Sequence, residues 1–297
     1  MSLSPQDSQL TDEHQLKASA YQPIIKTKDK LRYALVYEGD SKQRHQKGQV
    51  LIVLVAGVPG SERDYRYLTP LLNQWAPVVR VILPGFGILS DEAQAPASGM
   101  ERALYLKAVA DAEQWQKLLI VGHSMGGIAC TYWASIDQRV RSLALLCSVG
   151  IKMHRGMAFG ANMARFLLGL MRLPIIKTRI QKRFREAMIR MGFKSHVLDS
   201  LQLRLILQHV VHLNFKDVKK RLHAQYLAGL DQISMLYCFD DPIVDFEASK
   251  ALMEHLQQQF PQEKLVIRCI DKGGHNPQKH KNLEVDHWLH SLYTFYT

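Results

Sequence analysis

The sequence predicts an α/β fold: a mostly parallel central sheet flanked by helices, with an all-helical segment inserted between two strands. Short, unbroken apolar runs alternate along the chain with stretches of helical periodicity. Unbroken apolar runs are typical of strands buried on both faces of a parallel sheet. The alternation stops at Gly150 and resumes at Ile233, with a helical pattern throughout the interval. We therefore expect one helical insert in an otherwise regular strand–helix chain.

The expected strands follow in order. The first twenty residues are polar and are expected to be loosely structured. Residues 22–38 predict two short strands around the turn Lys28-Asp29-Lys30, and residues 43–48 predict a basic loop. Six apolar runs are then expected as buried strands: residues 50–56, 78–83, 118–121, 143–147, 233–239 and 265–270.

Helix-start signals lie between these runs. Ser61 is a candidate N-cap for a helix that carries apolar residues as far as Trp75. Ser98 followed by Glu101 forms a capping box, in which the two side chains satisfy each other's free backbone N–H groups. Residues 248–260 and 283–295 complete the expected helices of the core.

The insert has its own pattern. Breaks are expected at Leu173-Pro174 and at Gly192, and an apolar stripe interrupted by Lys177 lies between them. The stripe consists of Ile176, Ile180, Phe184, Met188 and Met191. We expect residues 1–20 to be a loose terminus, residues 21–150 and 231–297 to form the core, and residues 151–230 to form a cap over one end of the sheet.

Positive charge is concentrated in this insert. The chain carries 38 Lys+Arg and 27 Asp+Glu, or +11 with neutral histidines. Between Gly150 and Leu230 there are 16 basic and 3 acidic residues, or +13, so the remainder has 22 against 24, or −2. The insert is either a solvated helical face or a surface for an anionic membrane or lipid substrate. Nucleic acid is not expected, because no recognised binding motif is present.

Composition excludes several classes of protein. An apolar fraction of 47% argues against a disordered or fibrous chain. The sequence contains no run of 18 uncharged apolar residues, so a membrane-spanning helix is not expected. The start lacks the basic flank and apolar core of a secretory signal. Four scattered cysteines, Cys130, Cys147, Cys238 and Cys269, are expected as reduced core residues of a cytoplasmic protein. His209, His212 and His223 lack carboxylate or cysteine partners at ligand spacing, so no metal site is expected.

The segment VGHSMGG at residues 121–127 predicts a nucleophile. It follows an apolar run and precedes a helix-compatible stretch, which is the context of a G-x-S-x-G strand-to-helix turn. Such a turn holds the central serine, here Ser124, in a strained conformation at the start of a helix. His123 is expected to pack in the wall of the pocket rather than react.

A nucleophilic serine needs a base, and the base needs an acid to orient it. The run at 233–239 is followed by Asp240-Asp241-Pro242, and the run at 265–270 is followed by Asp271-Lys-Gly-Gly-His275. Both loops are expected at the same sheet edge as Ser124. We predict His275 as the base and Asp241 as the acid, with Asp240 as the alternative acid. The oxyanion donors are expected to be the backbone N–H groups of Met125 and Val58.

Together these motifs resemble the α/β-hydrolase superfamily. LVAGVPGS is similar to its oxyanion segment, VILPGFG to its PGxG loop, GHSMGG to its elbow, and DDPIV and GGHNP to its acid and base loops. The resemblance spans residues 22–296 in the same order. One departure is Ala56-Gly57, where many members have His-Gly.

The resemblance implies a serine hydrolase without a cofactor. Ser124 argues against the epoxide and haloalkane hydrolases of the superfamily, whose elbow carries aspartate. We expect cleavage of a carboxylic ester with a lipid-like acyl group, through an acyl-enzyme. A C–C bond hydrolase or thioesterase with the same triad, and a non-catalytic binding protein, are the alternatives. The expected partner is a small acyl substrate. Peripheral contact of the basic cap with an anionic membrane surface stays one of the alternatives for the insert, beside a solvated face and attraction of an anionic substrate.

Overall fold

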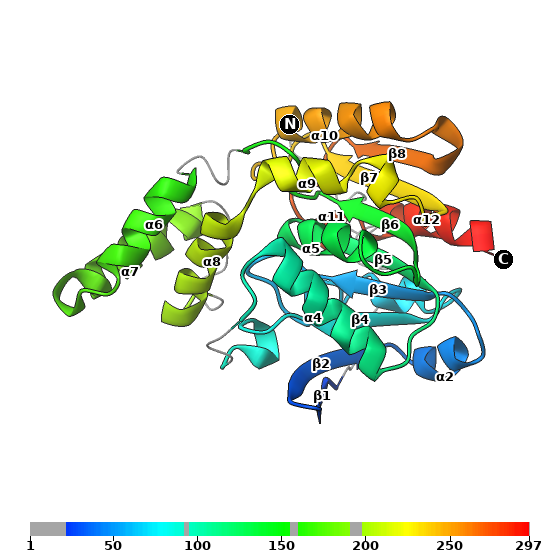
Figure 1. Ribbon diagram of the computed structural model, residues 1–297, viewed down its shortest axis with the longest axis horizontal. Helices are drawn as coiled ribbons and strands as arrows, with labels where there is room; N and C mark the ends of the chain where they lie inside the picture. The colour runs from blue at the N-terminus through cyan, green and yellow to red at the C-terminus, as the bar shows by residue number, and fades with distance from the viewer. Residues whose placement is uncertain (1–21, 92–94, 155–159, 191–197, 297) are drawn as a thin grey trace, which may run out of the picture.

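Eight strands in the described part of the chain form one sheet, in the order β1-β2-β4-β3-β5-β6-β7-β8 (Figure 1). The structure is a computed structural model that describes residues 22–91, 95–154, 160–190 and 198–296. β3 to β8 are parallel to one another, and β1 and β2 form an antiparallel hairpin added beside β4. The strands are β1 (Ile24–Lys28), β2 (Leu31–Tyr37), β3 (Leu51–Val55), β4 (Val78–Ile82), β5 (Leu118–His123), β6 (Val140–Leu146), β7 (Gln232–Cys238) and β8 (Leu265–Ile270).

Helices cover both faces of the sheet. The described α-helices are α2 (Ser41–Gln46), α3 (Thr69–Leu72), α4 (Gly99–Ala112), α5 (Met125–Ala134), α6 (Gly160–Leu170), α7 (Pro174–Arg190), α8 (Ser200–His212), α9 (Phe215–Arg221), α10 (Phe246–Gln259), α11 (Pro277–His280) and α12 (Asn282–Tyr293). Short 3₁₀ turns lie at Gly87–Leu89, Ala224–Tyr226, Gln262–Lys264 and Thr294–Tyr296.

Alternate side chains of each central strand pack against different helices, because successive residues of a strand point to opposite faces. In β3, Val53 and Val55 join the core cluster that contains residues of α4, α5 and α10. Ile52 and Leu54 join the cluster formed with α12 and the segment leading into α3. This two-sided burial is the physical reason for the unbroken apolar runs, and the predicted α/β architecture is confirmed.

Two local predictions near the amino terminus have different outcomes. The turn between the first two strands is confirmed: Asp29 and Lys30 have φ of 48° and 68° and join β1 directly to β2. The predicted basic loop at residues 43–48 is wrong, because this stretch lies largely in α2. α2 is held by contacts distant in sequence: the Ser41 hydroxyl donates to Asn73 Oδ1 over 2.7 Å and accepts from the Val78 N–H over 2.9 Å.

The two predicted helix starts also differ. At α4 the capping box is confirmed, since Ser98 Oγ accepts from the Glu101 N–H and Glu101 Oε2 accepts from the Ser98 N–H. The helix expected from Ser61 is wrong over most of its length, because residues 62–68 form turns and only α3 is helical. Asp64 helps to fix these turns: it accepts from the Ser61 N–H over 2.8 Å and pairs with Lys279 over 2.7 Å.

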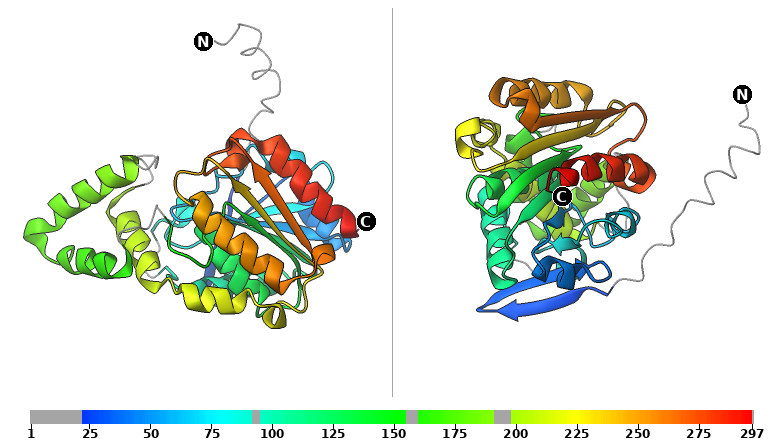
Figure 2. Two further views of the ribbon diagram at one scale, coloured as in Figure 1. Left: turned by 90° about the horizontal axis from the view of Figure 1, so that it is seen from above. Right: turned by 90° about the vertical axis from the view of Figure 1, so that its right-hand side faces the viewer.

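α6 to α9 lie between β6 and β7, where the sequence predicts an insert, and α6 to α8 extend beyond the carboxyl edge of the sheet (Figures 1 and 2). The break at Leu173-Pro174 is confirmed, because α6 ends at Leu170 and α7 begins at Pro174. Of the apolar stripe, Phe184 and Met188 are buried and Ile176 and Ile180 are half-buried, whereas Lys177 is exposed and lies outside it. Met191, Gly192 and the first twenty residues lie outside the described residues.

The last strand departs from two-sided burial. β8 is the edge of the sheet, so its residues are half-buried or exposed. All four cysteines are free, and the expectation of core positions is wrong for Cys269, which is exposed on β8; the other three are buried. Within the described ranges, no helix is long and apolar enough to cross a membrane.

Candidate active site

The turn from β5 into α5 holds Ser124 in a strained conformation. Its φ of 53° and ψ of −126° lie in a region that side-chain-bearing residues rarely adopt. Neighbouring backbone approaches so closely that only glycine fits beside it: a Cβ on Gly126 would lie 2.5 Å from the Ala56 carbonyl oxygen, and one on Gly122 would overlap Gly127. The glycines of the motif are therefore needed for this turn to form.

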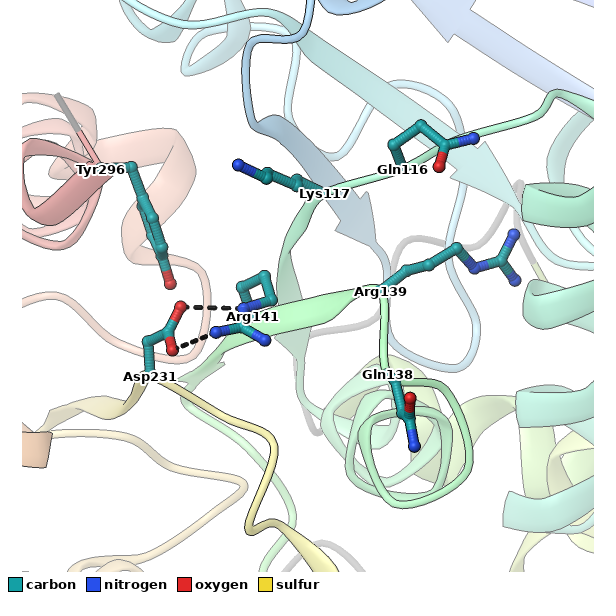
Figure 3. Close-up of a pocket in the computed structure, with 7 residues that line it drawn as sticks. All are labelled: Gln116, Lys117, Gln138, Arg139, Arg141, Asp231 and Tyr296. Carbon is teal, nitrogen blue, oxygen red and sulfur yellow. Dashed lines mark hydrogen bonds and ion pairs between the residues drawn. The ribbon is translucent and has the colours of Figure 1, made fainter.

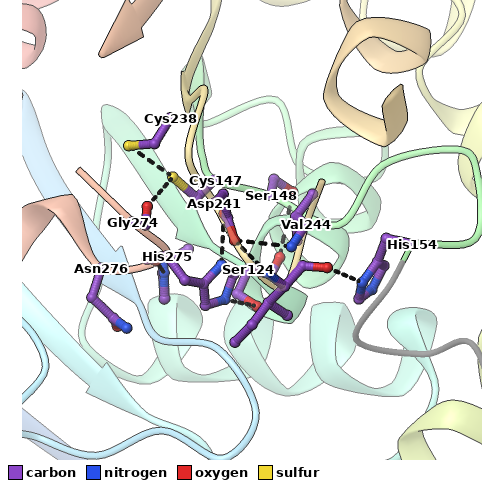
Figure 4. A network of polar contacts seen from close by, with 12 residues as sticks. Ser124, Cys147, Ser148, His154, Cys238, Asp241, Val244, Gly274, His275 and Asn276 are labelled. Atoms are coloured by element: carbon purple, nitrogen blue, oxygen red, sulfur yellow. Dashed lines mark hydrogen bonds and ion pairs between the residues drawn. The ribbon is translucent and has the colours of Figure 1, made fainter. Parts of the chain in front are cut away.

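Ser124, His275 and Asp241 form a hydrogen-bonded chain (Figure 4). His275 Nε2 lies 2.9 Å from Ser124 Oγ, and His275 Nδ1 lies 2.8 Å from Asp241 Oδ2. All three residues are buried, with exposures of 7%, 8% and 5% for Ser124, His275 and Asp241. A carboxylate only accepts, so Nδ1 carries the proton and the lone pair of Nε2 faces the serine hydroxyl.

The two adjacent aspartates after β7 have different contacts. The other oxygen of Asp241 accepts from the N–H groups of Ile243 and Val244, over 2.8 Å and 3.0 Å, which fixes the carboxylate toward His275. The exposed Asp240 points elsewhere and accepts from the backbone N–H groups of Gly273 and Gly274, over 2.9 Å and 2.8 Å. Asp241 thus contacts the histidine ring, whereas Asp240 ties down the loop that carries it.

Two glycines give this histidine loop its path. Gly274 has a φ of 59°, which favours glycine. A Cβ on Gly273 would lie 2.6 Å from Cys238 Sγ at the end of β7. The loop is therefore pressed onto the sheet edge, which brings His275 to the nucleophile.

His123 does more than fill the pocket wall. Its Nε2 lies 2.7 Å from the carbonyl oxygen of His275, to which it donates a hydrogen bond. Burial, and secondarily the neighbouring His275, lowers the pKa of His123 to about 3, so its ring is neutral near pH 7. The His123 ring thus holds the backbone of the loop that carries His275 in place.

The expected oxyanion donors lie on two segments beside Ser124. Met125 is the first residue of α5, so its N–H belongs to the group that a helix leaves without an internal partner. Val58 lies on the segment that follows β3. That segment passes directly over the nucleophile, because a Cβ on Gly57 would lie 2.9 Å from Ser124 Cβ.

Residues 52–285 match the alpha/beta hydrolase family. This chain belongs to that family. Its fold is similar to that of Cfl2 from Burkholderia cenocepacia, with a TM-score of 0.64 and 18% identity, covering 93% of this chain and 97% of that one. A putative lipase from Acinetobacter baumannii has a TM-score of 0.64 and 17% identity, with coverage of 99% and 97%. A bromoperoxidase from Bacillus anthracis has a TM-score of 0.60 and 16% identity, with coverage of 90% and 99%. No curated protein matches the sequence.

The predicted α/β-hydrolase fold is thereby confirmed.

A buried arginine that was not predicted from the sequence supports the turn that carries Ser124. Arg102 on α4 is 1% exposed and donates to the Met125 carbonyl over 3.0 Å. Burial lowers the pKa of Arg102 to about 10. The sequence around Arg102, next to the capping box of α4, does not indicate this role, because the contact with Met125 depends on how α4 packs against α5.

α8 joins the inserted helices to the hydrolase core. Its buried face includes Leu203 and Leu207, which belong to the same apolar cluster as Met125 and Phe86, and also the buried His209. The His209 ring meets Phe86 edge-on at 5.6 Å and donates from Nδ1 to the Leu205 carbonyl over 2.7 Å. Burial, followed by repulsion from Arg102, lowers the pKa of His209 to about 3. His209 is a packed core residue.

A separate pocket of about 350 Å³ lies at the opposite edge of the sheet (Figure 3). Lys117, Arg139 and Asp231 immediately precede β5, β6 and β7, so the pocket lies at the amino ends of these strands. Asp231 pairs with Arg141 there, and Arg139 pairs with Asp137 over 2.7 Å. Among the described residues, no group of three His, Cys, Asp or Glu side chains is arranged to hold a metal ion.

Proposed function

We propose that this protein is a serine hydrolase that cleaves a carboxylic ester, with a lipid-like acyl group, through an acyl-enzyme. The observation that carries the proposal is the hydrogen-bonded chain from Ser124 Oγ through His275 to Asp241, with the serine on a strained turn. A serine hydroxyl is a weak nucleophile until a base removes its proton. Here the unprotonated Nε2 of His275 lies at hydrogen-bonding distance from that proton.

In the first step, Ser124 Oγ forms a bond to the ester carbonyl carbon while its proton passes to His275 Nε2. The carbonyl electron pair moves onto oxygen, and the N–H groups of Met125 and Val58 donate to the resulting anion. Asp241 stabilises the imidazolium and holds its orientation. His275 then gives the proton to the departing alkoxide, the C–O bond to the alcohol breaks, and the acyl group remains on Ser124.

In the second half, water attacks the acyl-enzyme carbonyl while His275 takes one of its protons. Collapse of the second tetrahedral intermediate releases the carboxylic acid, and the proton returns to Ser124 Oγ. No redox partner takes part, and atoms balance as ester plus water giving acid plus alcohol. Met125, next to the nucleophile, belongs to the same buried cluster as Phe86 and the inward face of α8, so the side chains on this side of the site are apolar, which supports an apolar acyl group. A putative lipase and a putative aryl esterase are among the proteins of similar fold.

A fluorophosphonate probe tests the nucleophile, because it phosphonylates activated serines. We expect covalent labelling of the wild-type protein at Ser124, and none in Ser124→Ala. Ser135→Ala is the matched control: this serine lies at the end of the same helix, where its hydroxyl donates to the Tyr132 carbonyl over 2.7 Å. Equal labelling of Ser124→Ala, or none of the folded wild-type protein, overturns the proposal.

A substrate series tests the bond type. We expect hydrolysis of p-nitrophenyl esters, with kcat/KM rising from acetyl to longer acyl chains and lost in His275→Ala. An acyl-CoA and a vinylogous diketone acid are measured beside them, since a thioesterase or C–C bond hydrolase uses the same triad. Preference for either compound over every ester would overturn the ester assignment while leaving Ser124 as the nucleophile.

A further inference from the structure

Large apolar side chains are exposed along α6 and at the corner where α6 meets α7. Four of them occur within residues 163–175: Met163, Phe166, Leu173 and Ile175, with exposures of 46%, 59%, 52% and 92%. Single exposed apolar residues are ordinary on soluble proteins, but a local concentration marks an interaction surface. We refer to residues 160–190, which comprise α6, α7 and their connection, as the α6–α7 hairpin.

The same hairpin carries strong positive charge. Residues 160–190 contain eight basic residues and one acidic residue, Glu186, or +7. The basic residues are Arg165, Arg172, Lys177, Arg179, Lys182, Arg183, Arg185 and Arg190, and all are exposed. α7 buries Phe184 and Met188 on its inner side, so its basic residues face outward. A basic surface beside apolar side chains matches the chemistry of an anionic lipid surface.

The rest of the insert's charge is arranged differently. On α9, Arg221 lies over the rings of Tyr132 and Tyr226, and it pairs with Asp217 over 3.9 Å. Lys220 also lies over the Tyr226 ring. Tyr132 belongs to α5, so α9 is engaged with the hydrolase core. The +13 of the insert is therefore not one uniform surface: among the described residues, most of its exposed basic side chains lie on the α6–α7 hairpin, and the others lie on or beside helices next to the core.

The position of the hairpin suits contact with a flat surface. In both side and top views, the corner joining α6 to α7 is the part of the described structure farthest from the sheet (Figures 1 and 2). α8 links the hairpin to the carboxyl edge, where Ser124 follows β5. A flat partner that approaches from this side would thus touch the corner before it touches the core. This is also the side of the sheet on which the candidate nucleophile lies.

We propose that the α6–α7 corner docks the protein on an anionic lipid bilayer. Leu173 and Ile175 enter the interface between headgroups and acyl chains, and the basic residues of α7 lie beside the lipid phosphates. Apolar burial and attraction to negative headgroups act together in this arrangement. The proposal goes beyond hydrolysis: it concerns where the chain binds, and does not require Ser124 to react.

Co-sedimentation with vesicles tests the docking, using the full chain with Ser124→Ala so that turnover does not alter the lipid. We expect binding to phosphatidylcholine vesicles that contain phosphatidylglycerol, weakening with added salt, and little binding to phosphatidylcholine alone. Arg179→Gln with Lys182→Gln should weaken binding roughly 30-fold, since each basic residue near such a surface contributes about 1 kcal/mol. Leu173→Ser with Ile175→Ser should weaken it at least about tenfold.

The matched control is Lys216→Gln with Lys219→Gln, which removes two charges from α9 in the same insert. We expect this control to weaken binding less than about threefold, because α9 lies beside the core and away from the α6–α7 corner, so its exposed lysines are screened from a bilayer docked there (Figure 1). Thermal unfolding midpoints close to that of the parent protein show that each variant is folded.

Four results would overturn the docking proposal. The first two are equal binding to neutral vesicles and no binding to anionic ones. The third is an equal loss of binding in the α9 control. The fourth is a dimer in light scattering that Leu173→Ser with Ile175→Ser dissociates, without any vesicle binding. The last result would assign the corner to a second copy of the chain. Since binding is measured without the nucleophile, its failure leaves the labelling of Ser124 intact, and failure of labelling leaves the binding result intact.

Discussion

Replacing Asp241 by Asn separates the two adjacent aspartates through the tautomer of His275. One oxygen of Asp241 accepts from the N–H groups of Ile243 and Val244, and the other accepts from His275 Nδ1. In Asp241→Asn, the amide oxygen stays with the two backbone donors, so the NH₂ group faces Nδ1. The ring must then carry its proton on Nε2, which can no longer accept the proton of Ser124.

The expected loss is large for Asp241 and small for Asp240. A wrong tautomer in a Ser-His-Asp arrangement lowers kcat about 10⁴-fold, equivalent to about 5.5 kcal/mol of transition-state stabilisation. In Asp240→Asn, the amide oxygen still accepts from Gly273 and Gly274, so only the charge-assisted part of two exposed hydrogen bonds is lost. We expect kcat to fall less than about tenfold.

The assay is p-nitrophenyl ester hydrolysis by the wild-type protein, Asp241→Asn and Asp240→Asn at one pH, with kcat and KM determined separately. Thermal unfolding of each variant shows whether the fold is retained. A greater loss of kcat in Asp240→Asn than in Asp241→Asn would refute the assignment of the acid. Retention of a tenth or more of kcat in Asp241→Asn would refute the tautomer argument itself.

Three further predictions concern the support of the site and the insert. His123→Phe removes the hydrogen-bond donor to the His275 carbonyl, so the loop that carries His275 is held less firmly. We expect kcat to fall about tenfold with little change in KM, which corresponds to the loss of about one hydrogen bond. Unchanged kcat in ester hydrolysis would contradict this. Burial lowers the pKa of His209 to about 3 in the folded protein, so its ring stays neutral there. In the unfolded chain the same side chain takes up a proton below about pH 6.5, which stabilises the unfolded state. The free energy of unfolding therefore falls as the pH falls from about 6.5 towards 3. In urea unfolding between about pH 6 and 4, His209→Phe should reduce that slope by about 1.4 kcal/mol per pH unit, and an unaltered slope would show that His209 is already protonated when folded. Leu207→Ala should lower the free energy of unfolding by about 3 kcal/mol, because this fully buried residue anchors α8 to the core. Leu173→Ala should change the free energy of unfolding by less than about 0.5 kcal/mol, because Leu173 is half-exposed at the corner. Similar values for the two variants would contradict the packing of α8.

Local sequence signals gave reliable predictions where neighbouring residues decide the conformation. The capping box of Ser98 and Glu101 involves residues three apart, and the left-handed turn at Asp29 and Lys30 is set within two residues. The buried strands were predictable because burial on two faces favours apolar residues along most of each strand, with exceptions such as the buried Arg80 of β4. Strand ends were less accurate: β6 begins at Val140, ahead of the expected residue 143, because Val140 and Ser142 pair with Leu118 and Leu119 of β5 on either side of the charged Arg141.

Elements held by distant contacts were predicted poorly. α2 exists because Ser41 bonds to Asn73 and to the Val78 N–H, residues that lie more than thirty positions away. The turns after Ser61 similarly depend on Lys279. Helical propensity is a weak preference that such contacts override.

The sequence by itself determined the alternation of buried strands and helices, the glycine-flanked turn at Ser124, and the placement of acidic and histidine loops at one sheet edge. Only the tertiary structure decided which aspartate meets His275, because adjacent residues differ in direction rather than in composition. It also revealed that His123 and Arg102 brace the site. The net charge of the insert was countable from the sequence, but its division into an engaged α9 and an outward α6–α7 hairpin depends on which helix packs against the core, a choice made by contacts between residues far apart in the chain.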